Sequence, residues 1–289
     1  MCRFGVELMK IKKVINNNIV CAEDDKGKEL IVTGKGIGFG GKPGEEIDPD
    51  KIRKTYKMTS SSVQRRLMEL VEEIPYEHLK LTDDFIERIK GRIQCELNEN
   101  LLITLSDHIS FAILRKSKGI EFSNPLLTAI MEYYPDEYEL GKECLEMIKE
   151  TLGIKLKMDE AGFIAMHIVN AELNTSMNEV YDITNLIEGC VQVAEYYYDR
   201  KFDRKSLAFN RFAVHLRYFA QRLFSDTVFE DSKEAKDETF RRLIKETCKN
   251  HYKCSECIAE YVKNKYNKEV TEEELVYLTI HLKRINSTR

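Results

Sequence analysis

The sequence contains no run of hydrophobic residues that approaches the roughly 18 needed to cross a membrane, and its mean hydropathy is negative. The first nine residues also lack the apolar core of a secretory signal. Eight cysteines are spread through 289 residues, a distribution that favours free thiols over a disulfide framework. These absences argue against a membrane or secreted protein, and we expect a cytoplasmic one.

The composition is that of a globular protein, with 43% hydrophobic and 33% charged residues. A length of 289 residues suggests two domains, or three small ones. The net charge of −4 is unevenly distributed, because residues 9–58 carry 11 Lys and Arg against 8 Asp and Glu. A basic head on an acidic body predicts that a polyanionic partner binds the head.

The head has the pattern of short β-strands. Three β-branched runs, at residues 11–15, 19–22 and 30–33, are separated by Asn16–Asn18 and by the turn-forming segment 24–28. Six glycines and one proline within residues 34–44 exclude a helix there. About 50 residues give a marginal core, so we expect this antiparallel β head to dimerise.

The remainder of the chain is helical and repeats itself. Residues 144–168 align without a gap to residues 258–282, and residues 105–112 align to residues 212–219. The predicted fold is therefore a multidomain α+β protein, with a small antiparallel β head followed by two homologous helical bundles. We expect an extension at residues 1–8, the head at 9–63, a linker at 64–74, a first bundle at 75–178 and a second at 179–289.

The head combines residue types that read unpaired RNA. Amides recognise base edges, an aromatic ring stacks on a base, lysine neutralises phosphate, and glycine permits close approach of the backbone. The candidates are Lys13, Asn16, Asn17, Asn18, Lys35 and Phe39. Two other interpretations are that the asparagines only form a turn and that Phe39 belongs to the core. The glycines of residues 36–41 also match a dinucleotide-binding motif, but the helix which that motif requires does not follow.

Four histidines, His108, His167, His215 and His281, occupy matching places in the two repeats. Their repetition suggests packing, metal ligation, acid–base chemistry or phosphoryl acceptance. Arginines and lysines follow His108, His215 and His281, and their positive charges could pair with the phosphate group of a phosphohistidine. Cys248, His251, Cys254 and Cys257 are spaced three apart, so on a helix they fan around the axis and cannot all reach one ion. We therefore expect neither a metal centre nor a cofactor.

Several of these motifs resemble those of the BglG, SacY and LicT type of transcriptional antiterminators, and the resemblance runs from Met9 to the C-terminus. Residues 9–18 and 34–39 are similar to the two RNA-contacting stretches of that family, and the segments around the four histidines resemble its phosphotransferase regulation domains (PRDs). The RNA-contacting positions of the family fall on Lys13, Asn16, Asn18, Gly34, Lys35 and Phe39. Lys35 stands where relatives often have arginine, which exchanges a planar bidentate donor for an ammonium. Met9 is then a candidate start.

The resemblance implies a regulator without catalytic residues of its own. A homodimeric head would bind an RNA hairpin in a leader transcript and prevent terminator formation. A sugar-specific enzyme II would phosphorylate His108 and His167 to inactivate the protein, and the phosphocarrier HPr would phosphorylate His215 and His281 to activate it. Two alternatives are a DNA-binding activator with the same histidine domains, which needs a helix-turn-helix, and an enzyme that acts as a histidine phosphotransferase or metal hydrolase.

Overall fold

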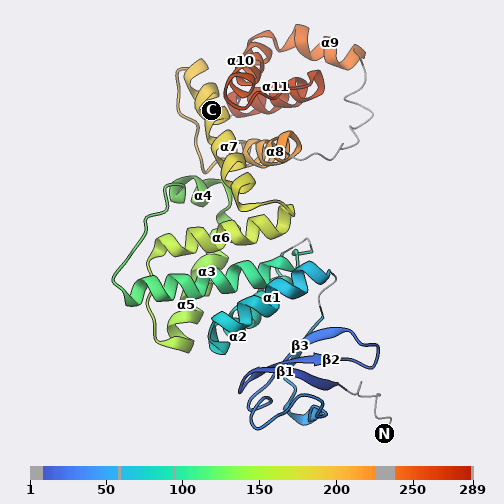
Figure 1. Ribbon diagram of the computed structural model, residues 1–289. Coiled ribbons are helices and arrows are strands. Elements are labelled where there is room, and N and C mark those ends of the chain that lie inside the picture. The colour runs from blue at the N-terminus through green and yellow to red at the C-terminus, as the bar shows by residue number, and fades with distance from the viewer. Residues whose placement is uncertain (1–8, 58–59, 94–95, 225–237, 288–289) are drawn as a thin grey trace. The chain divides into compact units, whose positions relative to one another are not determined.

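The computed structural model describes residues 9–57, 60–93, 96–224 and 238–287, so residues 1–8, expected as an extension, and Cys2 and Cys95 lie outside the described residues. The chain forms two compact units. The first contains the chain up to residue 122 together with residues 140–172, and the second contains residues 123–139 and the chain from residue 173 onward. Figure 1 shows the elements by colour and label. None of the helices described is both long and hydrophobic enough to span a bilayer.

The first unit begins with the predicted antiparallel sheet. Its strands pair in sequence order and are β1 (Lys10–Asn16), β2 (Ile19–Glu23), β3 (Glu29–Thr33) and β4 (Lys54–Tyr56), with the short 3-10 helix η1 (Pro49–Lys51) before β4. The β2–β3 turn forms because the Asp24 carboxylate accepts hydrogen bonds from the amides of Lys26 and Lys28, while Gly27 adopts a φ of +75°.

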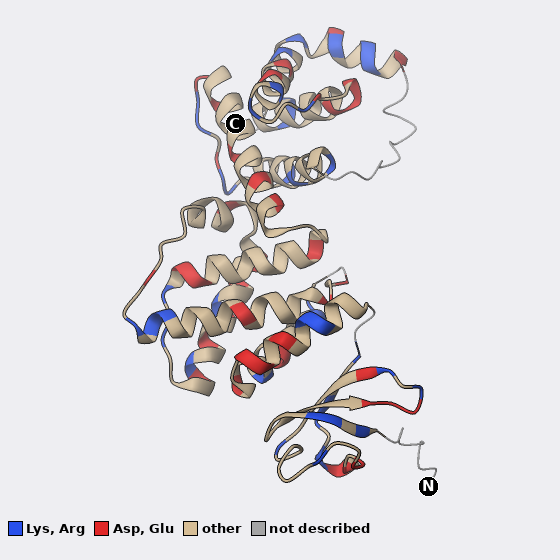
Figure 2. Ribbon diagram, in the orientation of Figure 1, with Lys and Arg blue, Asp and Glu red and all other residues tan. Residues whose placement is uncertain are grey.

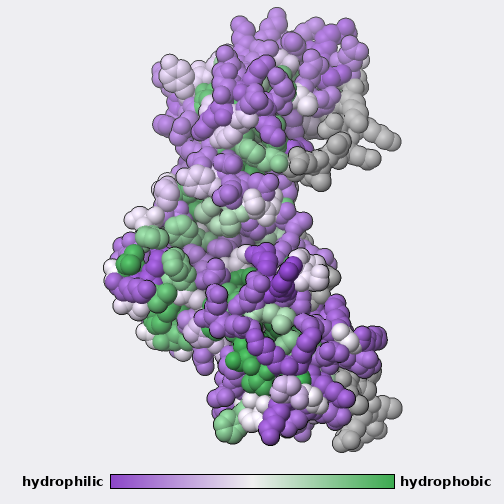
Figure 3. All heavy atoms as spheres, viewed as in Figure 1, coloured by the Kyte–Doolittle hydropathy of each residue, from purple (hydrophilic) through white to green (hydrophobic). Residues whose placement is uncertain are grey.

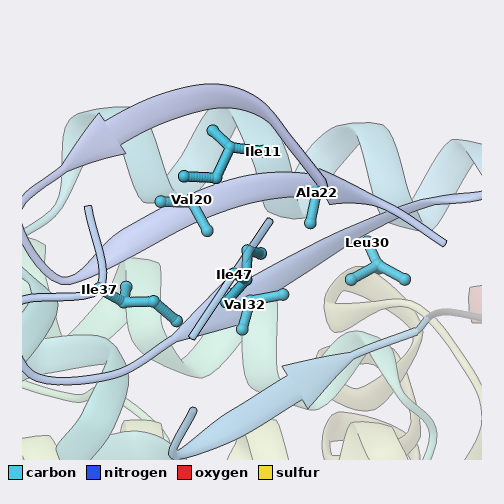
Figure 4. Close-up of a cluster of buried hydrophobic side chains, with 7 residues drawn as sticks. All are labelled: Ile11, Val20, Ala22, Leu30, Val32, Ile37 and Ile47. Atoms are coloured by element: carbon cyan, nitrogen blue, oxygen red, sulfur yellow. The ribbon is translucent and has the colours of Figure 1, made fainter. Parts of the chain in front are cut away.

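One face of this sheet is covered by the glycine-rich segment that follows β3. Side chains from β1, β2 and β3 pack against Ile37 and Ile47, which come from that segment (Figure 4). The cluster consists of Ile11, Val20, Ala22, Leu30, Val32, Ile37 and Ile47. The head thus has a hydrophobic core of its own, built largely from β-branched residues that suit a pleated surface.

The helices of the first unit are α1 (Ser61–Glu73), α2 (Tyr76–Lys90), α3 (Asn100–Ser117), α6 (Met158–Leu173) and the part of α5 (Pro135–Leu152) from residue 140. The Ser60 hydroxyl caps α1 by accepting a hydrogen bond from the Val63 amide. Helix α1 contains most of residues 64–74, which were expected to link the head to the first bundle. Lys54 of β4 pairs with Asp83 at 2.6 Å and with Glu87 at 2.9 Å, both on α2. Basic segments on β1 and acidic segments on α1 and α2 are visible in Figure 2.

The second unit contains α4 (Leu127–Tyr133), α7 (Met177–Tyr197), α8 (Leu207–Phe224), α9 (Glu238–Thr247), α10 (Lys249–Tyr266) and α11 (Glu272–Ser287). A capping box between Ser176 and Glu179 starts α7. The rings of Phe209, Phe212 and Phe219, all on α8, are fully buried.

The repeat predicted from the sequence is present in the structure. Helices α3 and α8, α5 and α10, and α6 and α11 begin at equivalent positions of the two alignments. One element departs from the repeat: α4 holds the place of α9 in the sequence, yet it packs on α7 and α8. Tyr134, just after α4, is buried, and Glu137 pairs with Arg217 at 2.9 Å.

Candidate RNA-binding loop and histidine sites

The two stretches predicted to contact RNA lie together in the head. The Asn18 side-chain oxygen accepts a hydrogen bond from the Gly36 amide at 2.9 Å, and its backbone oxygen accepts one from the Gly34 amide at 3.0 Å. The Gly38 amide donates to the backbone oxygen of Asn17 at 3.0 Å. Asn18 therefore organises the glycine loop, a structural role that residue type alone did not reveal.

Phe39 does not belong to the core. Its side chain is 77% exposed, which excludes the alternative interpretation of this residue. The turn that presents it requires glycine, because a Cβ at Gly38 would lie 2.2 Å from the backbone oxygen of Asn16. An exposed aromatic ring on a loop fixed by hydrogen bonds is suited to stack on an unpaired base.

The two lysines of the predicted surface are exposed. Lys13 of β1 pairs with Glu72 of α1 at 2.5 Å, and both side chains are about half exposed, at 57% and 45%. Exposed ion pairs contribute between about 0 and 1 kcal/mol, so a phosphate group could displace Glu72. Asn16 uses its side-chain oxygen to accept a hydrogen bond from the Asn18 amide at 2.9 Å.

In the first unit, His108 of α3 faces His167 of α6, with ring centroids 5.0 Å apart. The Glu160 carboxylate lies 3.0 Å from Nε2 of His108. Its other oxygen accepts a hydrogen bond from the Arg115 guanidinium at 2.9 Å. Arg115 in turn lies over the ring of Phe122, 4.4 Å from its centroid.

The second unit repeats this arrangement. His215 of α8 stacks on His281 of α11 at a centroid separation of 4.6 Å. Glu274 lies 3.9 Å from Nε2 of His215 and accepts a hydrogen bond from Arg222 at 2.6 Å. His215 and His281 also line a shallow pocket of about 410 Å³. The sequence aligned Glu160 with Glu274, but it did not indicate that each carboxylate joins a histidine to an arginine.

Burial favours the neutral form of three of these imidazoles, those of His167, His215 and His281. Burial, and secondarily the neighbouring His108, lowers the pKa of His167 to about 3. Burial, followed by His281 and Arg222, lowers the pKa of His215 to about 3. Burial also lowers the pKa of His281. A neutral ring retains the lone pair that a phosphoryl acceptor needs.

The buried His167 should make stability depend on pH. Below its ordinary pKa of 6.5 the unfolded chain binds a proton that the folded chain excludes, so the free energy of unfolding falls as the pH drops. At about 1.4 kcal/mol per pH unit, the native protein should lose about 2 kcal/mol more than His167→Gln between pH 7 and pH 5. Urea unfolding at the two pH values measures the difference. An equal loss in both proteins would contradict the lowered pKa of His167.

Hydrophobic side chains gather near Arg115, at the end of α3 and just beyond it (Figure 3). Phe111, Leu114 and Phe122 are each about half exposed, at 52%, 48% and 50%. Exposed hydrophobic patches are a feature of contact surfaces with other proteins.

The cysteine and histidine stripe at residues 248–257 has other partners. Cys248 and Cys254 are buried, and His251 is hydrogen-bonded to the Tyr198 hydroxyl at 2.8 Å. Within the described ranges, no three His, Cys, Asp or Glu side chains are placed to hold a metal ion.

The chain thus combines a small β head with two helical repeats, each of which carries a pair of histidines. The CAT RNA binding domain matches residues 9–65, and the PRD domain matches residues 83–171 and 188–285. The chain is 38% identical over 277 residues to the transcription antiterminator LicT of Bacillus subtilis strain 168, with 96% of this chain and 99% of that protein covered.

A second relative, the beta-glucoside operon antiterminator of Dickeya chrysanthemi, is 35% identical over 280 residues and covers 96% of this chain and 97% of its own length. The crystal structure of GlcT CAT-PRDI superposes with a TM-score of 0.50 at 37% identity, covering 57% of this chain and 98% of that one. The chain therefore belongs to the BglG and LicT family of sugar-responsive transcriptional antiterminators. The relatives' names indicate a regulator rather than an enzyme.

Proposed function

We propose that this protein is a cytoplasmic homodimer whose head binds an RNA hairpin in a leader transcript and thereby prevents a terminator from forming. The observation that carries this proposal is the loop in which Asn18 fixes the glycine segment and Phe39 is left exposed. The residues assigned to RNA recognition are Lys13, Asn16, Asn18, Gly34, Lys35 and Phe39. Gly34 is buried, so it would act by shaping the loop rather than by contact. A second head would widen this small surface and raise the affinity by bivalent binding.

The full chain should bind the hairpin of its own operon leader more tightly than duplex DNA of equal length. Phe39→Ala should weaken RNA binding by about 5- to 150-fold, because stacking contributes about 1–3 kcal/mol per base. Fluorescence anisotropy measures both. Tyr196→Ala is the matched control, since Tyr196 is a 90% exposed aromatic on α7. Equal binding to RNA and DNA, or an unchanged affinity in Phe39→Ala, would contradict the proposal.

The histidine pairs would control this activity by phosphorylation. An enzyme II specific for the inducing sugar would phosphorylate His108 and His167 and inactivate the protein, whereas HPr would phosphorylate His215 and His281 and activate it. Neutral rings and adjacent arginines support this assignment, and the hydrophobic surface at the end of α3 offers a place for a protein partner. Each transfer adds up to about two negative charges beside a helix interface, which can shift a monomer–dimer equilibrium.

His108→Ala should make antitermination independent of the inducing sugar, because an inhibitory phosphate acceptor is lost. His215→Ala should lower antitermination when preferred sugars are absent. A terminator–reporter fusion in the host measures the ratio of expression with and without inducer. That ratio should approach one in His108→Ala, and a ratio equal to that of the native protein would contradict the inhibitory role of His108.

A further inference from the structure

The first histidine of each pair presents its two ring nitrogens to different surroundings. Nε2 of His108 is buried and lies 3.0 Å from the Glu160 carboxylate, although the side chain as a whole is 15% exposed. Nε2 of His215 is likewise buried, 3.9 Å from Glu274, in a side chain that is 12% exposed. Neither Nε2 atom makes a hydrogen bond within the described residues, so each carboxylate acts on its histidine through its charge. Nδ1 of His108 and of His215, unlike Nδ1 of His167, is not among the buried polar atoms that lack a partner.

An arginine fixes the carboxylate in both units. Arg115 holds Glu160 at 2.9 Å, and Arg222 holds Glu274 at 2.6 Å. The arginine, the glutamate and the histidine occupy equivalent positions of the two repeats. Both glutamates are nearly inaccessible, with side chains 7% and 13% exposed. A carboxylate held in this way can act on the histidine but is hardly reached by solvent.

A carboxylate on the Nε2 side determines which nitrogen carries the proton of a neutral imidazole. Its negative charge favours the tautomer that carries the N–H on Nε2 and leaves the lone pair on Nδ1. In phosphoryl transfer the Nδ1 lone pair forms the new N–P bond, and the bond between phosphorus and the donor atom breaks. The donor leaves with that electron pair. The proton stays on Nε2, where the carboxylate offsets the positive charge of the ring.

We infer that His108 and His215 accept phosphate on Nδ1, and that Glu160 and Glu274 are the positioning residues that select this nitrogen. The inference rests on the proposed phosphorylation of these histidines and adds its regiochemistry. In each unit, the histidine, the glutamate and the arginine would then act together in phosphoryl transfer.

Part of the inference can be tested without any phosphate donor. Two-bond ¹H–¹⁵N spectra of the unphosphorylated full chain, labelled with [¹⁵N]histidine, distinguish the two neutral tautomers. Signals of His108 and His215 are assigned from their loss in His108→Gln and His215→Gln. We expect the Nε2–H tautomer at both positions. The Nδ1–H tautomer at either position would overturn the inference whatever the donor.

The second test uses HPr charged by enzyme I and phosphoenolpyruvate, and in parallel potassium phosphoramidate, on the full chain. Antibodies selective for each phosphohistidine isomer should detect the Nδ1 form on His215. Glu274→Gln should slow labelling by about 10- to 100-fold and yield a mixture of isomers. The control is Glu272→Gln on the same helix, whose side chain is 69% exposed and pairs with Arg241.

The outcomes separate the two hypotheses. Labelling of His215 on Nε2, or an unchanged isomer and rate in Glu274→Gln, would overturn the inference alone. If phosphoramidate labels Nδ1 and HPr transfers nothing, the inference stands and the proposed donor is wrong. Absence of label from both donors would overturn the proposed phosphorylation and the inference together.

Discussion

Gly34→Ala is expected to abolish RNA binding while the helices of both units stay folded. A Cβ at Gly34 would lie 1.8 Å from the backbone oxygen and 2.9 Å from the carbonyl carbon of Lys51, and backbone atoms cannot rotate away. The Arg53 amide donates to the Thr33 oxygen at 2.8 Å in the same place, so the shift would separate β3 from β4. Overpacking costs about 1–3 kcal/mol or more, and a head of this size has little stability to lose.

Fluorescence anisotropy measures the expected loss of hairpin binding, and circular dichroism measures whether the helices are retained. Gly91→Ala is the matched control. Gly91 ends α2 with a φ of −77°, and a Cβ there would meet no described atom within 4 Å. Gly91→Ala should bind RNA as the native protein does. Undiminished binding by Gly34→Ala would show that the β3 end can move without affecting the RNA surface.

Glu160→Ala should destabilise the first unit by about 3–5 kcal/mol, the usual cost of leaving a buried charge without its partner. Arg115 is 5% exposed, and its Nε and Nη1 atoms have no hydrogen-bond partner among the described residues. Glu160 is thus the carboxylate that balances this guanidinium, since their side chains meet at 2.9 Å. The rings of Phe111 and Phe122 beside Arg115 cannot replace a negative charge.

Hydrogen exchange of the α3 and α6 amides reports this loss in the unit concerned. Those amides should exchange much faster in Glu160→Ala than in the native protein, whereas amides of α8 and α11 should be unaffected. Glu121→Ala removes an exposed carboxylate that pairs with Lys116 and Lys157 and should leave exchange unchanged. Similar exchange in all three proteins would mean that water or a rearranged side chain compensates Arg115.

Local sequence signals were sufficient for most of the fold. The runs at residues 11–15, 19–22 and 30–33 became β1, β2 and β3 because β-branched residues and adjacent turn formers act over short distances. The strand β4 was harder to foresee, since Lys54–Tyr56 has no periodic pattern and forms a strand through its pairing with β3. Two helical repeats followed from the alignment of the chain with itself.

The candidate sites were only partly predictable. The four histidines were evident because they recur, and their pairing follows from the packing of α3 with α6 and of α8 with α11. The roles of Glu160 and Arg115 depend on how two helices face each other, which no spacing along one helix expresses. Likewise, the support that Asn18 gives to Gly36 arises between residues 18 positions apart.

The position of α4 limits how this gene can be divided or recombined. Residues 123–139 precede the boundary between the repeats, yet Tyr134 is 1% exposed inside the second unit and Arg217 lies 5.1 Å from its ring centroid. A second repeat excised at its sequence boundary would lose part of its own interior. We therefore expect an exchange of this repeat between relatives to keep its interior intact only when residues 123–139 are exchanged with it.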